Sequence, residues 1–509
     1  MNREIFINVS QHDKRVAILE NKKIEEFYVE RPDSVNLLGN IYKGRVDSVL
    51  PGMGAAFVNI GLEKNGFLYV SDVTGDTSGY EMFSDEPALP AGGAVEAGGR
   101  PEKKSGKAPS ISDLLKKGDE VLVQIVKEPI STKGARLTTH VSIPGRFLVL
   151  MPFENHIGLS KRIENRAERD RIRKILTELK LPKELGFIVR TAAEGVSLKD
   201  FQRESRYLIN LWNNIKARAR RAKPPQLVHQ EYDLILRVAR DMFTNDVVKL
   251  EVDSKGDFKR ISHFLRILAP QLRARLKFHF DRLPIFAKFE IESQIDKIYD
   301  RTVQLKSGGY LIFDQTESLL AIDVNSGKFV GKRNLEDTAF RTNMEAAEEV
   351  ARQLKLRDLG GIIIIDFIDM EYGEHRKSVF KTLEKQLESD KAKSKILSIS
   401  PIGLVEMTRQ RVRKSIEGKS YQTCPYCCGR GLVKSIPTVA IELMRKLEHA
   451  LGDSRARETF VTLNPEVAAH VSDPSRSMIK HIEKRFRKTV RVIEDPNMKI
   501  EDIKIEDRK

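Results

Sequence analysis

Two aspartates each end an apolar run, and a helical segment separates the two runs. Asp323 follows Leu319–Ile322, and Asp366 follows Ile362–Ile365. Sites in α/β sheets gather at the carboxyl ends of the strands, so the two carboxylates can lie side by side. Oxygen ligands of this kind suit magnesium, which keeps several of its waters. Such an ion orients a phosphate and neutralises the charge that builds on it. The pattern therefore predicts metal-assisted hydrolysis of a phosphodiester.

Asn325 is a third candidate at the same site. It lies two residues after Asp323, so in an extended chain both side chains point to one side. Its amide can hold a carboxylate or a metal-bound water in place. The alternative is structural, because an acid after a buried strand often only caps the next helix. Two matched acids at the ends of two strands favour the metal site.

The elements that must position these acids form a strand, a helix and a second strand. Residues 337–357 repeat alanine and aliphatic side chains at helical spacing, and Gly360-Gly361 ends that helix. Continuous apolar strands on both sides of a helix predict a parallel pair of strands that is buried on both faces. The carboxyl ends of such a pair lie next to each other.

A cysteine turn offers a second kind of chemistry. Cys424 and Cys427 form a C-x-x-C turn followed by Gly-Arg-Gly, and Cys428 is an extra neighbour. Structural zinc takes four ligands, so two thiolates make half a site that a second subunit can complete across a two-fold axis. We therefore expect a zinc ion shared between subunits of a homodimer or homotetramer. The alternative is a redox dithiol, but a thioredoxin-type motif should open a helix.

Composition limits the class of protein. The chain has 509 residues and a formal net charge of +16. A basic excess of this size favours a polyanionic partner, usually nucleic acid. The N-terminus has no apolar run of signal-peptide length, and no segment approaches the length of a membrane span. With only three cysteines, all near residue 425, we expect a cytoplasmic protein without a disulfide framework.

Short strands with turn residues between them follow residue 40. They are predicted at 41–50, 55–60, 66–70, 120–127 and 135–141, as in a small OB-fold barrel. Residues 74–110 interrupt them and are rich in Gly, Pro, Ala and Ser, which predicts a mobile loop without a core. We interpret this loop as an insertion that the fold tolerates rather than as an RNA contact. The basic run 216–223 fits a solvated helix face and a phosphate track equally well.

Several long motifs resemble the ribonuclease E/G family. They are residues 40–46, 321–327, 364–370, 403–409 and 424–431. The resemblance runs from about residue 4 to about residue 440 and weakens in 74–110 and in the tail. Because the motifs occur in the same order, the resemblance is specific. The short tail is similar to the ribonuclease G branch of the family.

The resemblance implies an α+β multidomain fold. A split RNase H-like subdomain encloses an inserted OB-fold barrel and a 5′-sensor, and a DNase I-like α/β catalytic domain, a zinc turn and a small C-terminal domain follow. The implied boundaries are 1–39 and 236–298 for the RNase H-like subdomain, 40–139 for the barrel and 140–235 for the 5′-sensor. They are 299–420 for the catalytic domain, 421–434 for the zinc turn and 435–509 for the C-terminal domain.

The resemblance also implies the reaction. Family members cut single-stranded, A/U-rich RNA internally, leave a 5′-phosphate and a 3′-hydroxyl, and act in ribosomal RNA processing and messenger decay. The positions that match the magnesium ligands are Asp323 and Asp366, and Asn325 matches the supporting amide. Stimulation by a 5′-monophosphate is implied as well. The matching residues are Arg190, Thr191, Gly145, Val149 and Lys393, the last in place of an arginine.

For the barrel, the resemblance implies an RNA-binding face. Phe57 and Phe67 match its aromatic positions, and Lys133 matches a basic one. Aromatic rings on such a sheet stack unpaired bases. From sequence alone, the two phenylalanines would rather be core residues.

Two other functions compete with this one. A non-catalytic single-stranded RNA-binding protein would share the fold, although it is expected to lose a metal-binding acid. A deoxyribonuclease would use the same hydrolysis, because magnesium does not itself select the sugar.

Overall fold

The computed structural model divides into two compact units, residues 1–415 and 416–509. The described residues are 2–32, 37–73, 110–129, 133–316, 318–327, 335–388, 390, 392–400, 402–411, 421–422, 424–427, 429–453, 456–473 and 478–507. Residues 74–109, which hold almost all of the predicted mobile loop, and Cys428 lie outside them. Among the described residues, no helix combines the length and the apolar character that a membrane crossing requires.

The first sheet joins the beginning of the chain to a segment more than 200 residues away. Its order is β15 (Leu276–Phe278), β14 (Val247–Val252), β1 (Arg3–Val9), β2 (Lys14–Glu20) and β3 (Lys23–Glu30). β1 pairs with β14 in parallel, whereas β2 and β3 form antiparallel neighbours. Helices α4 (Leu234–Asp241) and α5 (Lys255–Leu268) share a hydrophobic core with this sheet. Helices α6 (Ile285–Lys288) and α7 (Ile291–Ile298) follow it.

The predicted barrel is confirmed. Its strands are β4 (Ile41–Leu50), β5 (Ala55–Asn59), β6 (Gly66–Tyr69), β8 (Arg136–Thr138) and β7 (Glu120–Lys127), and a β4–β7 pairing closes it. β13 (Gln226–His229) pairs with β4 outside the ring, and α1 (Ile111–Leu114) contributes to the barrel core. Alternating apolar residues fill that core, as period-two strands require.

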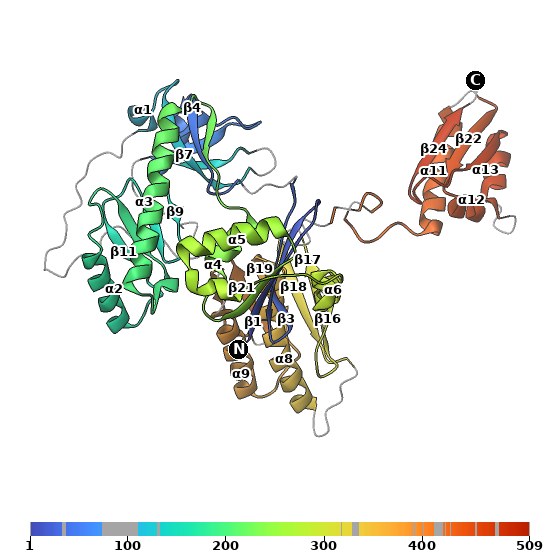
Figure 1. Ribbon diagram of the computed structural model, residues 1–509. Coiled ribbons are helices and arrows are strands. Elements are labelled where there is room, and N and C mark those ends of the chain that lie inside the picture. Colours follow the sequence, from blue (N-terminus) through green and yellow to red (C-terminus); the bar gives the residue numbers. More distant parts are fainter. Residues whose placement is uncertain are drawn as a thin grey trace. The chain divides into compact units, whose positions relative to one another are not determined.

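A small sheet with two helices follows the barrel. Its strands are β11 (Ile157–Leu159), β12 (Gly186–Val189), β10 (Leu148–Met151) and β9 (Ile143–Pro144). Helix α2 is Arg166–Glu178, and α3 runs from Leu198 to Arg221. The side chain of Ser197 caps α3, which packs on β10 and β13. Figure 1 shows α3 as one long helix beside β9 and β11 of this sheet. The basic run 216–223 includes its exposed last turn.

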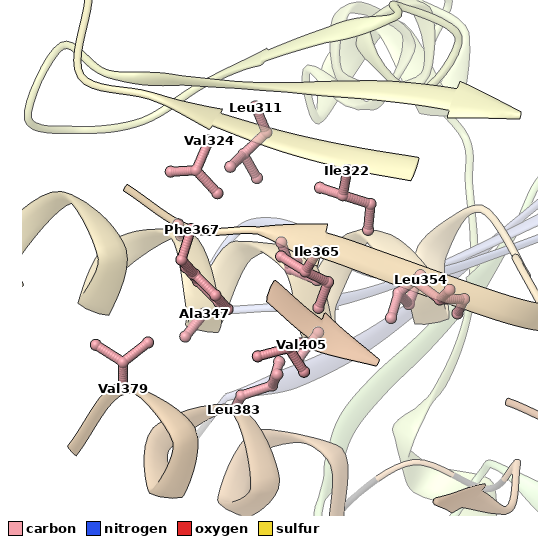
Figure 2. Packing of buried hydrophobic residues seen from close by; sticks show 14 of the residues in the cluster. Leu311, Ile322, Val324, Ala347, Leu354, Ile365, Phe367, Val379, Leu383 and Val405 are labelled. Carbon is pink, nitrogen blue, oxygen red and sulfur yellow. The ribbon is translucent and has the colours of Figure 1, made fainter. Parts of the chain in front are cut away.

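The catalytic candidates lie on a six-stranded sheet. Its order is β16 (Thr302–Gln304), β17 (Tyr310–Gln315), β18 (Leu319–Asn325), β19 (Gly361–Asp366), β21 (Leu404–Arg409) and β20 (Ser394–Ile396). β18 and β19 are parallel, as predicted, and helix α8 (Leu335–Leu356) connects them. Helix α9 (Gly373–Glu388) follows β19. Figure 2 shows side chains of α8 and α9 packed against the same face of the sheet.

The expectation that both strands are buried on both faces was wrong. Residues of β18 and β19 that face α8 and α9, such as Ile322 and Ile365, are buried. On the other face, Ile362 is 53% exposed. The reason is topological, because β17 and β21 pair antiparallel with the central strands and need no crossover helix that would cover the second face.

Among its described residues, the second unit contains a three-stranded sheet and three helices. The strands are β23 (Thr489–Glu494), β22 (Glu458–Leu463) and β24 (Ile503–Asp507), and the helices are α11 (Ile436–Asp453), α12 (Pro465–Ser472) and α13 (Met478–Phe486). One hydrophobic cluster joins them. The names RNase H-like and DNase I-like, and the domain boundaries implied with them, stay predictions.

Candidate functional site

Asp323 and Asp366 lie directly opposite each other on adjacent strands. The register of the parallel pair β18–β19 joins these two residues, and both side chains are exposed on the open face of the sheet. Neighbouring strands lie about 5 Å apart, so one cation can reach both carboxylates. The buried neighbours Ile322 and Ile365 hold the two strands against the helices on the opposite face. The sheet thus presents two acids together to solvent.

Asn325 extends this group along β18. Its Nδ2 donates a hydrogen bond to Oδ2 of Asp323, at 2.8 Å. The chain turns immediately afterwards at Gly327, whose φ is +60°. A Cβ on this glycine would lie 2.5 Å from the carbonyl oxygen of Gly308, so the turn after β18 requires a glycine.

The two acids carry negative charge that no described cation balances. Burial first, and then the charges of Asp323 and Asp369, raise the pKa of Asp366. Within the described ranges, neither Asp323 nor Asp366 forms an ion pair. By contrast, Asp314 on the neighbouring strand β17 pairs with Arg301, at 2.7 Å. The uncompensated pair therefore fits a cation better than a structural role.

The donor set suits magnesium rather than an ion that needs many protein ligands. Among the described residues, no group of three or more His, Cys, Asp or Glu side chains could hold a metal ion. Magnesium is commonly held by one or two carboxylates and retains its waters. Two carboxylates and a supporting amide on an open sheet face match that requirement.

The loop after β19 is fixed by helix α8. Buried Asn343 donates to the carbonyl of Ile368 at 2.7 Å and accepts from its backbone N–H at 3.0 Å. At the start of the same helix, the carboxylate of Glu336 accepts from the backbone N–H of Glu371 at 2.8 Å. The crossover helix therefore positions both the strands and the segment that follows Asp366. Sequence reasoning missed Asn343, although an amide on a buried helix face is a usable signal.

Arg190 and Gly145 lie together beside the small sheet, directly after β12 and β9. Nη1 of Arg190 donates to the carbonyl of Gly145 at 2.6 Å and to Oδ1 of Asp241 at 2.7 Å. Thr191 follows directly and begins a short helical turn, and Val149 lies on β10. Four of the five residues implied for phosphate sensing thus lie on two neighbouring strands or beside them.

Lys393, the fifth residue, lies in a different sheet. It is exposed and directly precedes β20 at the edge of the six-stranded sheet. Lysine keeps the positive charge of an arginine but lacks its planar fork for a phosphate. Its role in a phosphate pocket stays a prediction.

Two phenylalanines lie on the outside of the barrel. Phe57 of β5 pairs in register with Phe67 of β6, and both are half-buried and outside the barrel core. Placement in the core, the simpler expectation from sequence, was therefore wrong. Tyr69 packs edge-on against Phe67, and the guanidinium of Arg136 lies 5.2 Å from the Tyr69 ring. Sequence reasoning missed Tyr69 and Arg136. Exposed Lys133 lies three residues before Arg136.

The cysteine turn belongs to the second unit. The backbone N–H of Gly431 donates to Sγ of Cys427 at 3.4 Å, and this bond is the first cause that lowers the pKa of that thiol. Lys499 donates to the carbonyl of Pro425 at 2.6 Å, and the Tyr426 hydroxyl accepts from the backbone of Ile500 at 2.7 Å. The turn is thus held on its own domain in a form that favours a thiolate, which is the state that binds zinc.

The placement of the turn also bears on the redox alternative. Cys424 is exposed, and helix α11 begins only at Ile436, so the C-x-x-C segment does not open this helix. This geometry agrees with the argument that disfavours a redox dithiol.

Comparison with known proteins gives a consistent result. The model described as "Ribonuclease E/G family" matches residues 142–412, and the model described as "RNase E/G, Thioredoxin-like domain" matches residues 423–508. The second match gives a fold type to the small C-terminal domain, for which the sequence alone suggested none.

Individual relatives cover almost the whole chain. Ribonuclease G of Salmonella typhimurium (strain SL1344) and of Escherichia coli (strain K12) are each 40% identical over 97% of this chain and 98% of the relative. Ribonuclease E of Haemophilus influenzae is 36% identical over 98% of this chain but only 51% of its own length. With a family model across more than half of its length and relatives of this identity, the chain belongs to the ribonuclease E/G family.

Proposed function

We propose that this chain is an endoribonuclease that cuts single-stranded, A/U-rich RNA by magnesium-assisted hydrolysis and leaves a 5′-phosphate and a 3′-hydroxyl. The observation that carries the proposal is the in-register pair Asp323 and Asp366 on an open sheet face. Membership of the family supports an endoribonuclease role. The net charge of +16 supports a polyanionic substrate. We expect its substrates to include ribosomal RNA precursors and messenger RNA.

Each residue of the acidic group has a role in this proposal. Asp323 and Asp366 would hold the magnesium ion, and Asn325 would keep the Asp323 carboxylate oriented through its hydrogen bond. Magnesium, when bound, supplies positive charge for the phosphoryl oxygens and a bound water of lowered pKa. The uncovered face gives an RNA strand direct access to both acids.

A pocket for the substrate's 5′-monophosphate forms the second part of the proposal. Arg190 would bind the phosphate, with Thr191 and the backbone of Gly145 and Val149 around it. An arginine oriented by a carboxylate and a carbonyl supports this assignment, because its direction is already fixed before a ligand arrives. Lys393 would add a single positive charge.

The outer face of the barrel is the proposed RNA-binding surface. Phe57 and Phe67 would stack unpaired bases, and Lys133 would contact the backbone. The half-exposed rings on adjacent strands support this role, since buried core residues could not stack on a ligand.

For the cysteine turn, we propose a structural zinc ion shared between two subunits. Cys424 and Cys427 would each supply a thiolate, and a second copy of the turn would complete the four ligands. The expected result is that Cys424→Ser converts the oligomer into a monomer, as measured by light scattering. Zinc content, measured on the same samples, should fall in parallel. An unchanged mass for the variant would contradict the shared site.

The central experiment uses a fluorescent A/U-rich RNA with a 5′-monophosphate. We expect internal cleavage with magnesium, no cleavage with EDTA, and a loss of cleavage in Asp323→Asn. RNA that is bound but stays whole in magnesium would support the non-catalytic alternative. An oligonucleotide of mixed ribose and deoxyribose units tests the other alternative, because a deoxyribonuclease would also cut at the deoxyribose positions.

A further inference from the structure

The loop between β9 and β10 forms one wall of the proposed phosphate pocket, and side chains from three separate segments fix it. The loop is residues 145–147, between Pro144 of β9 and Leu148 of β10. Besides the Arg190 bond to Gly145, the backbone N–H of Arg190 donates to the carbonyl of Phe147 at 2.8 Å. The loop thus depends on residues far away in sequence.

Glu204 of helix α3 is the first of these. It is fully buried, and its Oε1 accepts from the backbone N–H groups of Phe147 at 2.9 Å and of Leu148 at 3.1 Å. A Cβ added to Gly145 would lie 2.1 Å from the same oxygen. The carboxylate therefore occupies the space that a side chain at position 145 would need, and it holds the backbone of Phe147 and Leu148.

Asp241, at the end of helix α4, is the second. Its Oδ1 accepts from Arg190 at 2.7 Å, and Arg240 binds its Oδ2 at 3.0 Å. Arg240 in turn pairs with Glu231 at 2.7 Å and donates to the carbonyl of Pro144 at 3.2 Å. Burial alone would raise the pKa of Asp241, but Arg240 and Arg190 hold it below its usual value. Asp241 is therefore charged and sets the direction of the Arg190 side chain.

Arg146 anchors the same loop from inside. Its Nη1 and Nη2 donate to the carbonyls of Ala239 at 3.1 Å and Phe243 at 2.8 Å. Its Nε and the Oε2 of Glu204 are both buried without a hydrogen-bond partner. Buried polar atoms without partners are unusual in a region kept only for stability. The two unpaired atoms indicate that this network has a role other than stabilising the fold through its own hydrogen bonds.

We propose that Glu204 and Asp241 are positioning residues that set the preference for RNA with a 5′-monophosphate. Glu204 fixes the backbone of the loop, and Asp241 orients Arg190, so that both are in place before the phosphate binds. Neither residue would touch the reacting atoms. This inference rests on the proposed phosphate pocket, but it concerns two residues that sequence reasoning did not single out.

The test compares two RNAs of one sequence, with a 5′-monophosphate or a 5′-hydroxyl, on the full chain. The readout is the ratio of their kcat/KM values. For Asp241→Ala and Glu204→Ala, we expect this ratio to fall roughly tenfold, the effect of one charge-assisted hydrogen bond. The loss should appear in KM for the monophosphorylated RNA, while cleavage of the hydroxyl RNA stays unchanged.

Conservative variants separate positioning from folding. Glu204→Gln keeps one oxygen that can accept both backbone bonds, so it should retain most of the preference. Asp241→Asn keeps one acceptor for Arg190 but loses the charge and the second acceptor, so it should retain only part of the preference. The matched control is Asp233→Ala at the other end of α4, where Asp233 pairs with Lys14 at 2.8 Å and Arg260 at 3.0 Å. Its ratio should equal that of the unmodified chain.

The outcomes distinguish the two proposals. If the unmodified chain cleaves both RNAs at equal rates, the 5′-phosphate preference is absent and the positioning roles fall with it. If the unmodified chain discriminates but both alanine variants keep or increase its ratio, only the positioning roles are overturned. If Asp233→Ala lowers the ratio as much as Asp241→Ala does, the effect belongs to the stability of α4 and again overturns the positioning role.

Discussion

Two groups of carboxylates in this molecule lie in opposite environments. Asp323 and Asp366 are exposed, adjacent and without a described cationic partner. Glu204 is fully buried, and Asp241 is surrounded by arginines. An external cation can neutralise the charge of the first group. In the second group, arginines already balance the charge of Asp241, and burial disfavours the charged form of Glu204. The difference separates acids that bind a ligand from acids that hold other residues in place.

The contrast has an energetic basis. Two exposed acids side by side repel each other modestly in water, and a divalent ion removes that repulsion. A buried carboxylate is stable only with hydrogen bonds or a paired cation, so changing it alters the fold around it. Changes in the first group should therefore affect catalysis, and changes in the second should affect stability and selectivity.

The largest effect is expected at the exposed pair. Asp366→Asn should lower kcat for RNA cleavage by about a thousandfold, because a lost metal ligand costs several kcal/mol of charge stabilisation. The thermal stability should change little or increase, since the substitution removes like-charge repulsion. The matched control is Asp314→Asn on β17, where Arg301 already balances the acid. Similar losses of kcat in both variants would show that cleavage depends on acids of this sheet face in general and not on the pair Asp323 and Asp366.

The buried group should respond to pH. Burial raises the pKa of Glu204 to about 7 from an ordinary value of 4.5. Between these values the folded chain keeps a proton that the unfolded chain has released, so the free energy of unfolding falls as pH rises. Chemical denaturation at about pH 5 and about pH 8 should show a decrease of about 3 kcal/mol relative to Glu204→Gln, which cannot ionise. If the free energy of unfolding changes with pH in the same way in the unmodified chain and in Glu204→Gln, Glu204 does not titrate in this range.

A smaller effect is expected at Asn325, which links the exposed pair to its own strand. Asn325→Ala should raise the magnesium concentration needed for half-maximal cleavage by about 10- to 100-fold, because it removes support from a metal ligand. The control is Asn8→Ala, which breaks an equivalent 2.7 Å bond to Asp253 on a different sheet. A lower kcat with an unchanged magnesium requirement would instead place Asn325 on the RNA.

The barrel extends the comparison to side chains that should act on binding alone. Phe67→Ala should raise KM for RNA by about tenfold, which is the order expected for one lost stacking contact, and leave kcat unchanged. Phe280→Ala is the control, since Phe280 is 87% exposed and lies outside the barrel, two residues after β15. An equal rise in KM for both variants would mean that exposed aromatic area in general, rather than the barrel face, contributes to binding.

Sequence reasoning succeeded where the signal was local. The strand–helix–strand unit that holds Asp323 and Asp366 spans fewer than 50 residues, and its apolar runs and glycines define it. The five barrel strands were visible for the same reason, since alternation and turn residues lie within short windows. The exposed second face of the six-stranded sheet was missed, because its cause is the antiparallel pairing with β17 and β21.

The pocket around Arg190 shows the opposite case. Gly145, Arg190, Glu204 and Asp241 come from four segments spread over almost 100 residues, and none has a motif of its own. A resemblance to the family pointed to the first two, but Glu204 and Asp241 appeared only in the folded chain. An acid on an amphipathic helix is normally solvent-exposed, so no sequence pattern predicts that Glu204 is fully buried.

The sequence alone thus determined the basic charge, the barrel strands, the order of the acids and the spacing of the cysteines, because each depends on composition or on neighbours along the chain. Tertiary structure decided which sheet face stays open, that Phe57 and Phe67 point outward, and which buried carboxylates hold Arg190 and its loop. The physical reason is that burial and charge pairing depend on contacts between distant segments, and these contacts exist only after the sheets and helices have packed.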